Sequence, residues 1–170
     1  MNCNATKQDK DVQFDRLFLP DRDNTSAAFH DTADGKVTPA PALTHAQQQI
    51  ASDTLVLVGL DKSRTQVTDE NGTFVAIDRV AQRMEVRALA LSSLEDLQTN
   101  TTAAMRRQIV RTAQGHGFFS LWMSVFAHDP VMTRMLIEAF EGTATEGFDP
   151  ETGRSLSPRP SNGLPHAGKI

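Results

Sequence analysis

The segment that most constrains this chain of 170 residues lies between residues 101 and 141, where apolar side chains are densest and helix-boundary signals are clearest. In its first half, apolar residues recur at helical spacing at Met105, Ile109, Val110 and Ala113. Asn100 or Thr101 offers an oxygen that can cap the first turn. Beyond Gly117, large apolar side chains point to nearly every side of a helix, as they do in a segment that is buried all round. The sequence therefore predicts a helix over residues 101–126.

A second helix is indicated directly after this one. Asp129 is a capping carboxylate, and Pro130 is the residue that best fits the first helical position. Gly142 can adopt the left-handed conformation that ends a helix. We therefore predict a helix over residues 130–141 that closes on the preceding one and forms the nucleus of the core.

Composition excludes several classes of protein. The chain has 17 basic and 21 acidic side chains, a balance that provides no general attraction to nucleic acid or to anionic membranes. Its one cysteine allows no internal disulfide, which favours a reducing compartment. No apolar run approaches the roughly 20 residues of a membrane span, and the first residues lack the apolar core of a signal peptide. We expect a chain that is cytoplasmic at synthesis.

Both ends of the sequence are rich in loop-forming residues and carry only scattered apolar side chains, so we predict extended arms over residues 1–53 and 142–170. A short helix capped by Thr44 is the one regular element expected in the first arm. Such arms become ordered when their apolar anchors contact neighbouring subunits. The candidate anchors are Phe14, Leu17, Phe18, Leu19, Phe148, Leu156, Leu164 and Ile170.

The compact core is predicted over residues 54–141 and begins with a small β-hairpin over residues 54–77. Residues 55–58 are an aliphatic run rich in strand formers. Asn71 and Gly72 are a favourable turn pair between residues 64–68 and 73–77. The alternative is that the next helix begins as early as Thr73.

That next helix is predicted over residues 75–92, followed by a turn or short helical piece before residue 101. Its apolar stripe is expected to face the core and consists of Ile77, Val80, Ala81, Met84, Ala88 and Leu91. Arg79, Arg83 and Arg87 recur every four residues on another face.

Charge is unevenly distributed along the chain. Residues 79–111 contain six arginines against three acidic residues, whereas residues 129–151 contain one arginine against six. A solvated surface explains the arginines as well as any special role does. Among special roles we favour pairing with an acidic segment of another subunit over phosphate binding. The candidate residues for either role are Arg79, Arg83, Arg87, Arg106, Arg107 and Arg111.

Signals of catalysis are weak. The five histidines show no metal-ligand spacing and have no cysteine partners, so we expect no metal and no cofactor. His116, with His128 and Asp129 nearby in sequence, could act as a general base in a small hydrolase. A glycine-flanked histidine is more often a hinge or a tight backbone contact.

These observations favour a mainly α fold with about three core helices, a minor hairpin and long terminal arms. Its expected function is that of a non-enzymatic structural or assembly subunit of a large complex, with no membrane contact. By analogy of body plan we expect a bacteriophage virion component, in the head, connector or tail, whose partners include copies of itself. The alternative is a helical nucleic-acid-binding or regulatory protein that uses the arginines.

Overall fold

The computed structural model describes residues 13–20, 23–60, 64–68, 72, 74–143, 145–156 and 169–170. It is mainly helical, as predicted, with two small antiparallel hairpins in the part of the chain that is described. The helices are η1 (Phe14–Arg16), α2 (Thr25–Ala28), α3 (His45–Val58), α4 (Arg79–Thr99), α5 (Ala103–His116), α6 (Phe119–Val125), α7 (Pro130–Ala139) and η2 (Thr145–Gly147). The strands are β1 (Phe29–Asp31) paired with β2 (Val37–Pro39), and β3 (Arg64–Thr68) paired with β4 (Phe74–Asp78).

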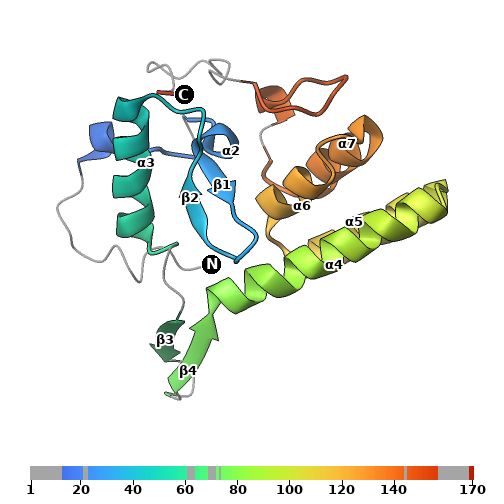
Figure 1. Cartoon of the computed structure of the whole chain (residues 1–170), viewed down its shortest axis with the longest axis horizontal. Helices are drawn as coiled ribbons and strands as arrows, with labels where there is room; N and C mark the ends of the chain where they lie inside the picture. The colour runs from blue at the N-terminus through green and yellow to red at the C-terminus, as the bar shows by residue number, and fades with distance from the viewer. Residues whose placement is uncertain are drawn as a thin grey trace.

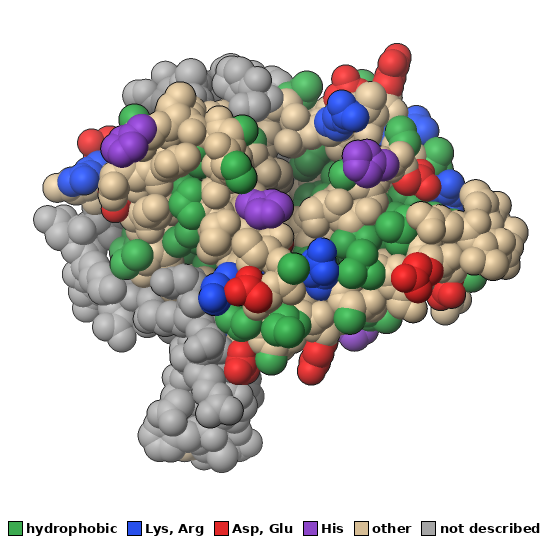
Figure 2. Space-filling view, in the orientation of Figure 1, with side chains coloured by type: hydrophobic (Ala, Val, Ile, Leu, Met, Phe, Trp, Pro, Cys, Tyr) green, Lys and Arg blue, Asp and Glu red, His purple; other side chains and the backbone are tan. Residues whose placement is uncertain are grey.

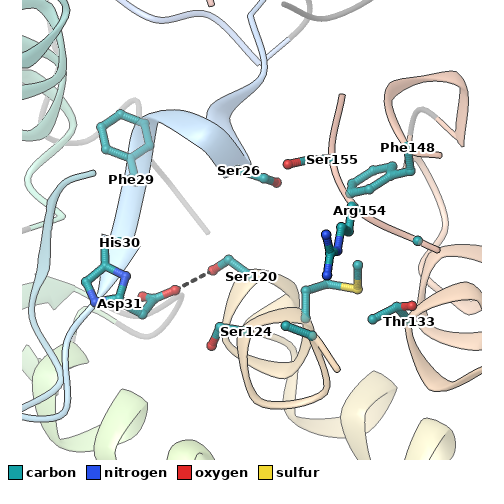
Figure 3. A pocket seen from close by; sticks show the side chains of 13 residues that line it. Ser26, Phe29, His30, Asp31, Ser120, Ser124, Thr133, Phe148, Arg154 and Ser155 are labelled. Atoms are coloured by element: carbon teal, nitrogen blue, oxygen red, sulfur yellow. Dashed lines mark hydrogen bonds between the residues drawn. The ribbon is translucent and has the colours of Figure 1, made fainter. Parts of the chain in front are cut away.

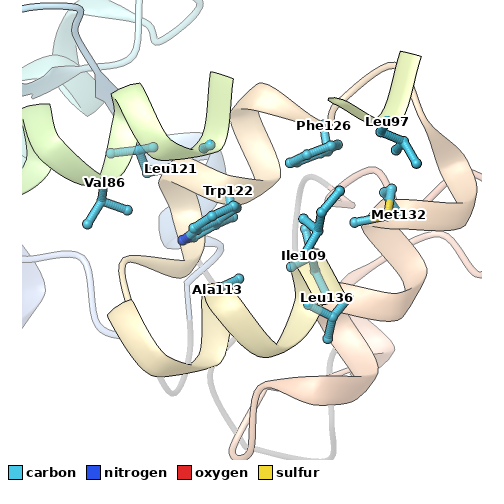
Figure 4. Close-up of a cluster of buried hydrophobic side chains, with 11 residues drawn as sticks. Val86, Leu97, Ile109, Ala113, Leu121, Trp122, Phe126, Met132 and Leu136 are labelled. Atoms are coloured by element: carbon cyan, nitrogen blue, oxygen red, sulfur yellow. The ribbon is translucent and has the colours of Figure 1, made fainter. Parts of the chain in front are cut away.

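Helices α4 to α7 form the helical unit, in which α6 packs across α4 and α7 packs beside α5 (Figure 1). Trp122 and Phe126 of α6 lie at its centre, fully buried, with their rings nearly parallel and 6.4 Å apart (Figure 4). Helices α5 and α7 run in the same direction. Near their first residues Arg106 pairs with Asp129, the N-cap of α7, and near their last residues Gln114 donates to the carbonyl of Ala139. The predicted Phe/Trp/Met nucleus of the core therefore lies at this junction.

The described residues between 13 and 60 form the N-terminal unit, which has its own apolar cluster. Phe18, Ala28, Leu43 and Ala51 are buried together, and the C-terminal Ile170 inserts among them. Thr44 caps α3 through a capping box with Gln47, as the sequence indicated.

The described parts of the two predicted arms are thus built into the fold, because Phe18 and Ile170 are buried together and Phe148 packs against Phe119 of α6. The division into separate domains at residues 53 and 141 stays a prediction.

Three contacts hold the N-terminal unit against the helical unit. Arg83 of α4 donates to the carbonyl oxygens of Gly35 and Leu60, at 3.4 and 3.1 Å. Ser120 of α6 donates to the carboxylate of Asp31 at 2.8 Å. Gly35, in the turn between β1 and β2, lies so close to Val80 that a Cβ atom would come within 2.5 Å of the carbonyl oxygen of Val80.

The hairpin is shorter than predicted. Strands β3 and β4 lie on either side of Gly72 as expected, while Asn71 lies outside the described residues, and residues 55–58 are the last turns of α3 and not a strand. Local strand propensity is overridden here because Ala51, Thr54 and Leu55 share the buried side of a helix that Thr44 has already started. Gly59, in the left-handed conformation, ends that helix.

Helix α4 was also predicted with the wrong limits. It begins at Arg79 behind the N-cap Asp78, and it continues through residues 92–97 to Thr99. Leu94 and Leu97 pack against the core cluster, and this burial extends the helix through a segment that we predicted to be a turn or short piece.

The predicted helix over residues 101–126 is broken into α5 and α6. Its N-cap is Thr102, not Asn100 or Thr101. The break lies at Gly117 and at Phe118, whose φ of +57° is unusual for a side chain of this size. Trp122 holds the break by donating its indole N–H to the carbonyl of Gly117 at 3.0 Å. Helix α7 begins at Pro130 as predicted but ends at Ala139, ahead of Gly142.

Candidate interaction surface

Helix α4 has two apolar stripes, and the core uses the one that the sequence did not favour. Val86, Ala90 and Leu97 face α6 and are buried. Arg83 lies on this same side and is only 3 % exposed. The expectation that Met84 and its stripe face the core is therefore wrong. The two stripes differ little in size, so the large side chains of α6 decide which one is buried.

The second stripe consequently lies on the surface. Met84 is 49 % exposed, and Ala81 and Ala88 are exposed beside it. Val80 is partly buried because the turn at Gly35 packs against it and against the Cγ of Met84, and Leu91 is partly buried at the other end of the stripe. Figure 2 shows hydrophobic side chains along the edge of the molecule that α4 forms, with acidic side chains among them. We call the surface made by Val80, Ala81, Met84, Ala88 and Leu91 the outer face of α4.

The six candidate arginines do not form one surface. Arg83 is bound inside the chain. Burial holds the pKa of its guanidinium below the ordinary value, although the nearby Asp31 carboxylate acts in the opposite direction. Arg106 pairs with Asp129 at 2.7 Å, at the start of α7. Arg107 and Arg111 are exposed on α5. Arg79 and Arg87 are half-buried on α4.

The candidate arm anchors also differ in how deeply they are buried. Leu17, Phe18 and Ile170 are buried inside the chain, while Leu19 and Leu156 are half-buried. Phe148 packs edge-on against Phe119 with ring centres 6.1 Å apart. Phe14 is 54 % exposed, and Leu164 lies outside the described residues.

The two candidate histidines lie on the surface, and the nearby Asp129 is engaged by other groups. His116 is exposed at the end of α5 and His128 is exposed ahead of α7. The carboxylate of Asp129 is occupied, since one oxygen accepts from the amides of the first turn of α7 and the other pairs with Arg106. Among the described residues, no group of three or more histidine, cysteine or acidic side chains could hold a metal ion.

Several contacts between distant segments had no recognisable signal in the sequence. Asp23, which is 2 % exposed, accepts a hydrogen bond from the backbone amide of Lys169, and Asn24 donates to the carbonyl of Leu156. Ser120 and Asp31 face a cavity to which Arg154 also contributes. Each pair is separated by dozens of residues, and neither periodicity nor a local motif could connect its members.

Within the described part of the chain, no helix combines the length and the apolar character needed to cross a bilayer. Comparisons with models of protein families, with curated proteins and with solved structures found no match to this chain.

Proposed function

We propose that this chain is a non-enzymatic assembly subunit that binds other protein chains, including copies of itself, through the outer face of α4. One observation carries the proposal: Met84 is half exposed at the centre of an apolar stripe on a long helix. An apolar helix face that the chain's own core does not cover is a common contact surface between subunits. The neighbouring alanines allow another helix to approach closely.

The charges that flank this stripe favour a second copy in antiparallel orientation. The first half of α4 carries Arg79 and Arg87, and its second half carries Glu95 and Asp96. A twofold pairing centred near Ala88 would place Arg79 of each copy beside Asp96 of the other, at the two ends of the contact. A twofold contact uses the same patch on both subunits, and such complementary charges fix its register.

Sedimentation velocity over a wide range of protein concentrations tests this pairing. We expect the full chain to associate as its concentration rises, and Met84→Glu to remain monomeric because a charge would be buried at the contact. Val56→Glu is the matched control, since Val56 is 65 % exposed on α3, away from α4. A wild-type chain that stays monomeric throughout, or a Met84→Glu variant that associates like wild type, would contradict the proposal.

The narrower form of the proposal is a component of a bacteriophage virion, in the head, connector or tail. It is supported by the sequence pattern of a small core flanked by segments with sparse apolar anchors, without a recognisable catalytic motif. Cosedimentation of the chain with intact particles tests it. The chain should be lost from the particles when Met84→Glu replaces the wild-type residue, and its absence from particles would remove this narrower form alone.

The second candidate function is nucleic-acid binding through α5, favoured by the exposed Arg107 and Arg111, which lie one turn apart. Phosphate contacts make affinity fall steeply with added salt. If this function holds, replacing both arginines with glutamine will weaken binding to a DNA or RNA duplex and flatten its salt dependence. Unchanged salt dependence in the double variant would exclude this role for the two arginines.

A further inference from the structure

A cavity of about 290 Å³ lies where the N-terminal unit, the helical unit and the C-terminal loop meet (Figure 3). One wall is formed by β1 with Asp31, another by α6 with Ser120, and a third by residues 148–155 with Arg154. Its size is near the lower end of the range of small-molecule sites, which is about 300–1,000 Å³.

Arg154, on the C-terminal wall, forms no ion pair with a described residue, although it interacts electrostatically with Asp149 of the same loop. In Figure 3 the guanidinium of Arg154 extends into the cavity. It donates no hydrogen bond to any residue that the structure describes. A guanidinium with all its donors free to a cavity is suited to a planar or tetrahedral oxyanion, which it can bind through two parallel hydrogen bonds.

The negative charge on the opposite wall is already engaged. Asp31 accepts a hydrogen bond from Ser120 at 2.8 Å, and it interacts electrostatically with the buried Arg83 behind it. His30 also lines this wall. The hydrogen bond from Ser120 and the positive charge of Arg83 therefore offset part of the repulsion that Asp31 exerts on an anion.

The rest of the lining combines hydroxyl and apolar groups. Ser26 and Ser155 offer hydroxyls near the mouth, while Phe29, Met123 and Phe148 offer apolar surface. Inorganic phosphate alone would leave this apolar surface without a contact. A ligand with both an anionic group and an apolar body would satisfy the two parts of the lining together.

We infer that this cavity binds a small organic oxyanion, a carboxylate or a phosphate ester, whose charged group pairs with Arg154 and whose apolar body packs between Phe29, Met123 and Phe148. This inference does not depend on the outer face of α4. The bound molecule would bridge the three parts of the fold that form the walls, and it would stabilise the chain by mass action.

The test is a titration of the isotopically labelled full chain, followed through the backbone amide signals of Phe29, Ser120, Ser124 and Arg154. Phenyl phosphate and benzoate are the probes, and benzyl alcohol and inorganic phosphate are the controls that lack one half of the ligand. We expect saturable shifts at these amides with at least one probe and weaker binding of both controls. The tighter of the two probes identifies the phosphate or the carboxylate class.

Variants connect the shifts to the cavity. Arg154→Gln should lower the affinity for the bound probe by about tenfold or more, as expected for loss of a charged hydrogen-bonding partner. Arg107→Gln, which removes an exposed arginine outside the cavity, should leave affinity unchanged. Ala127→Phe narrows the cavity without altering Arg154 and should also weaken binding. Absence of saturable shifts with both probes, or equal affinity in Arg154→Gln and Arg107→Gln, would overturn the inference.

Discussion

Two glycines with positive φ show how closely this chain is packed at single residues. Gly35 has a φ of +77°, and an added Cβ would meet the backbone oxygen of Val80 at 2.5 Å. Gly142 has a similar φ of +81°, but a Cβ there would meet nothing within 4 Å. The two positions therefore separate steric crowding from backbone strain.

We predict that Gly35→Ala destabilises the fold by about 3 kcal/mol, through left-handed strain together with overpacking against a backbone atom that cannot move freely. Gly142→Ala should cost only about 1 kcal/mol, from strain alone. Urea unfolding measures both free energies of unfolding. Equal losses at the two positions would show that the turn between β1 and β2 does not pack against α4 as described.

Arg83 is a second residue whose role is structural. Arg83→Met keeps most of the side-chain volume but leaves the carbonyl oxygens of Gly35 and Leu60 without their donor. We expect a loss of about 2–4 kcal/mol in the free energy of unfolding. Arg107→Met, at an exposed site, should change it by no more than about 0.5 kcal/mol. If Arg83→Met leaves the free energy of unfolding unchanged, the hydrogen bonds of Arg83 do not stabilise the fold.

Among the loops, the segment around Asp149 depends on one carboxylate. Asp149 accepts hydrogen bonds from the amide and hydroxyl of Thr152 and from the amide of Glu151. These bonds, with Thr152 contributing most, hold the pKa of Asp149 below its usual value of 3.8. The same loop carries Gly153, which packs against Thr133, and Arg154 of the cavity wall.

The pH dependence of this loop follows from that lowered pKa. The carboxylate form of Asp149 stabilises the loop fully above pH 3.8, and this stabilisation is lost as the pH falls through the lower pKa of the folded state. A carboxyl-detected NMR titration should therefore give Asp149 a pKa below 3.8. The amide of Thr152 should exchange faster in Asp149→Ala at neutral pH. A pKa at or above 3.8 would contradict the hydrogen-bonded loop.

Among the helices and strands, several local boundary signals were reliable, although the N-cap of α5 is Thr102 and α7 ends ahead of Gly142. Thr44, Asp129 and Pro130 were recognised as start signals, and the hairpin around Gly72 formed as predicted. The errors concern segments whose local sequence is compatible with two arrangements. Residues 55–58 could form strand or helix, and α4 could bury either of two apolar stripes. Tertiary contacts determined both outcomes: α3 packs against Phe18, and α4 packs against α6. Such contacts between distant segments cannot be predicted from one sequence.

For the whole molecule, the C-terminal residues hold the N-terminal unit together. Ile170 is 7 % exposed within the apolar cluster of that unit, and the side chain of Lys169 pairs with Asp23 at 3.6 Å. The cavity and the contacts between the two units likewise join segments that are far apart in the sequence. The three walls of the inferred ligand site come from segments that could not be brought together before the fold was known.

We predict that Ile170→Ala lowers the free energy of unfolding by about 2 kcal/mol or more, because it empties space between Phe18 and Ala28. Hydrogen exchange should accelerate in residues 25–58 and remain slow in α6 and α7. Val131→Ala, at a residue that is 42 % exposed on α7, is the control and should leave both regions unchanged. Uniform acceleration along the whole chain would mean that the two units unfold as one.

We propose that the exposed part of the outer face of α4 is accessible in the isolated chain and is covered by another copy on assembly. Methionine oxidation by dilute peroxide, quantified residue by residue with mass spectrometry, tests it most directly, because Met84 is 49 % exposed and Met132 is fully buried. We expect Met84 to oxidise rapidly in dilute protein and to become protected as the protein concentration rises. Met132 should oxidise slowly at every concentration. A Met84 as slow as Met132 in dilute protein would contradict the fold, and a Met84 equally fast at every concentration would contradict the assembly surface.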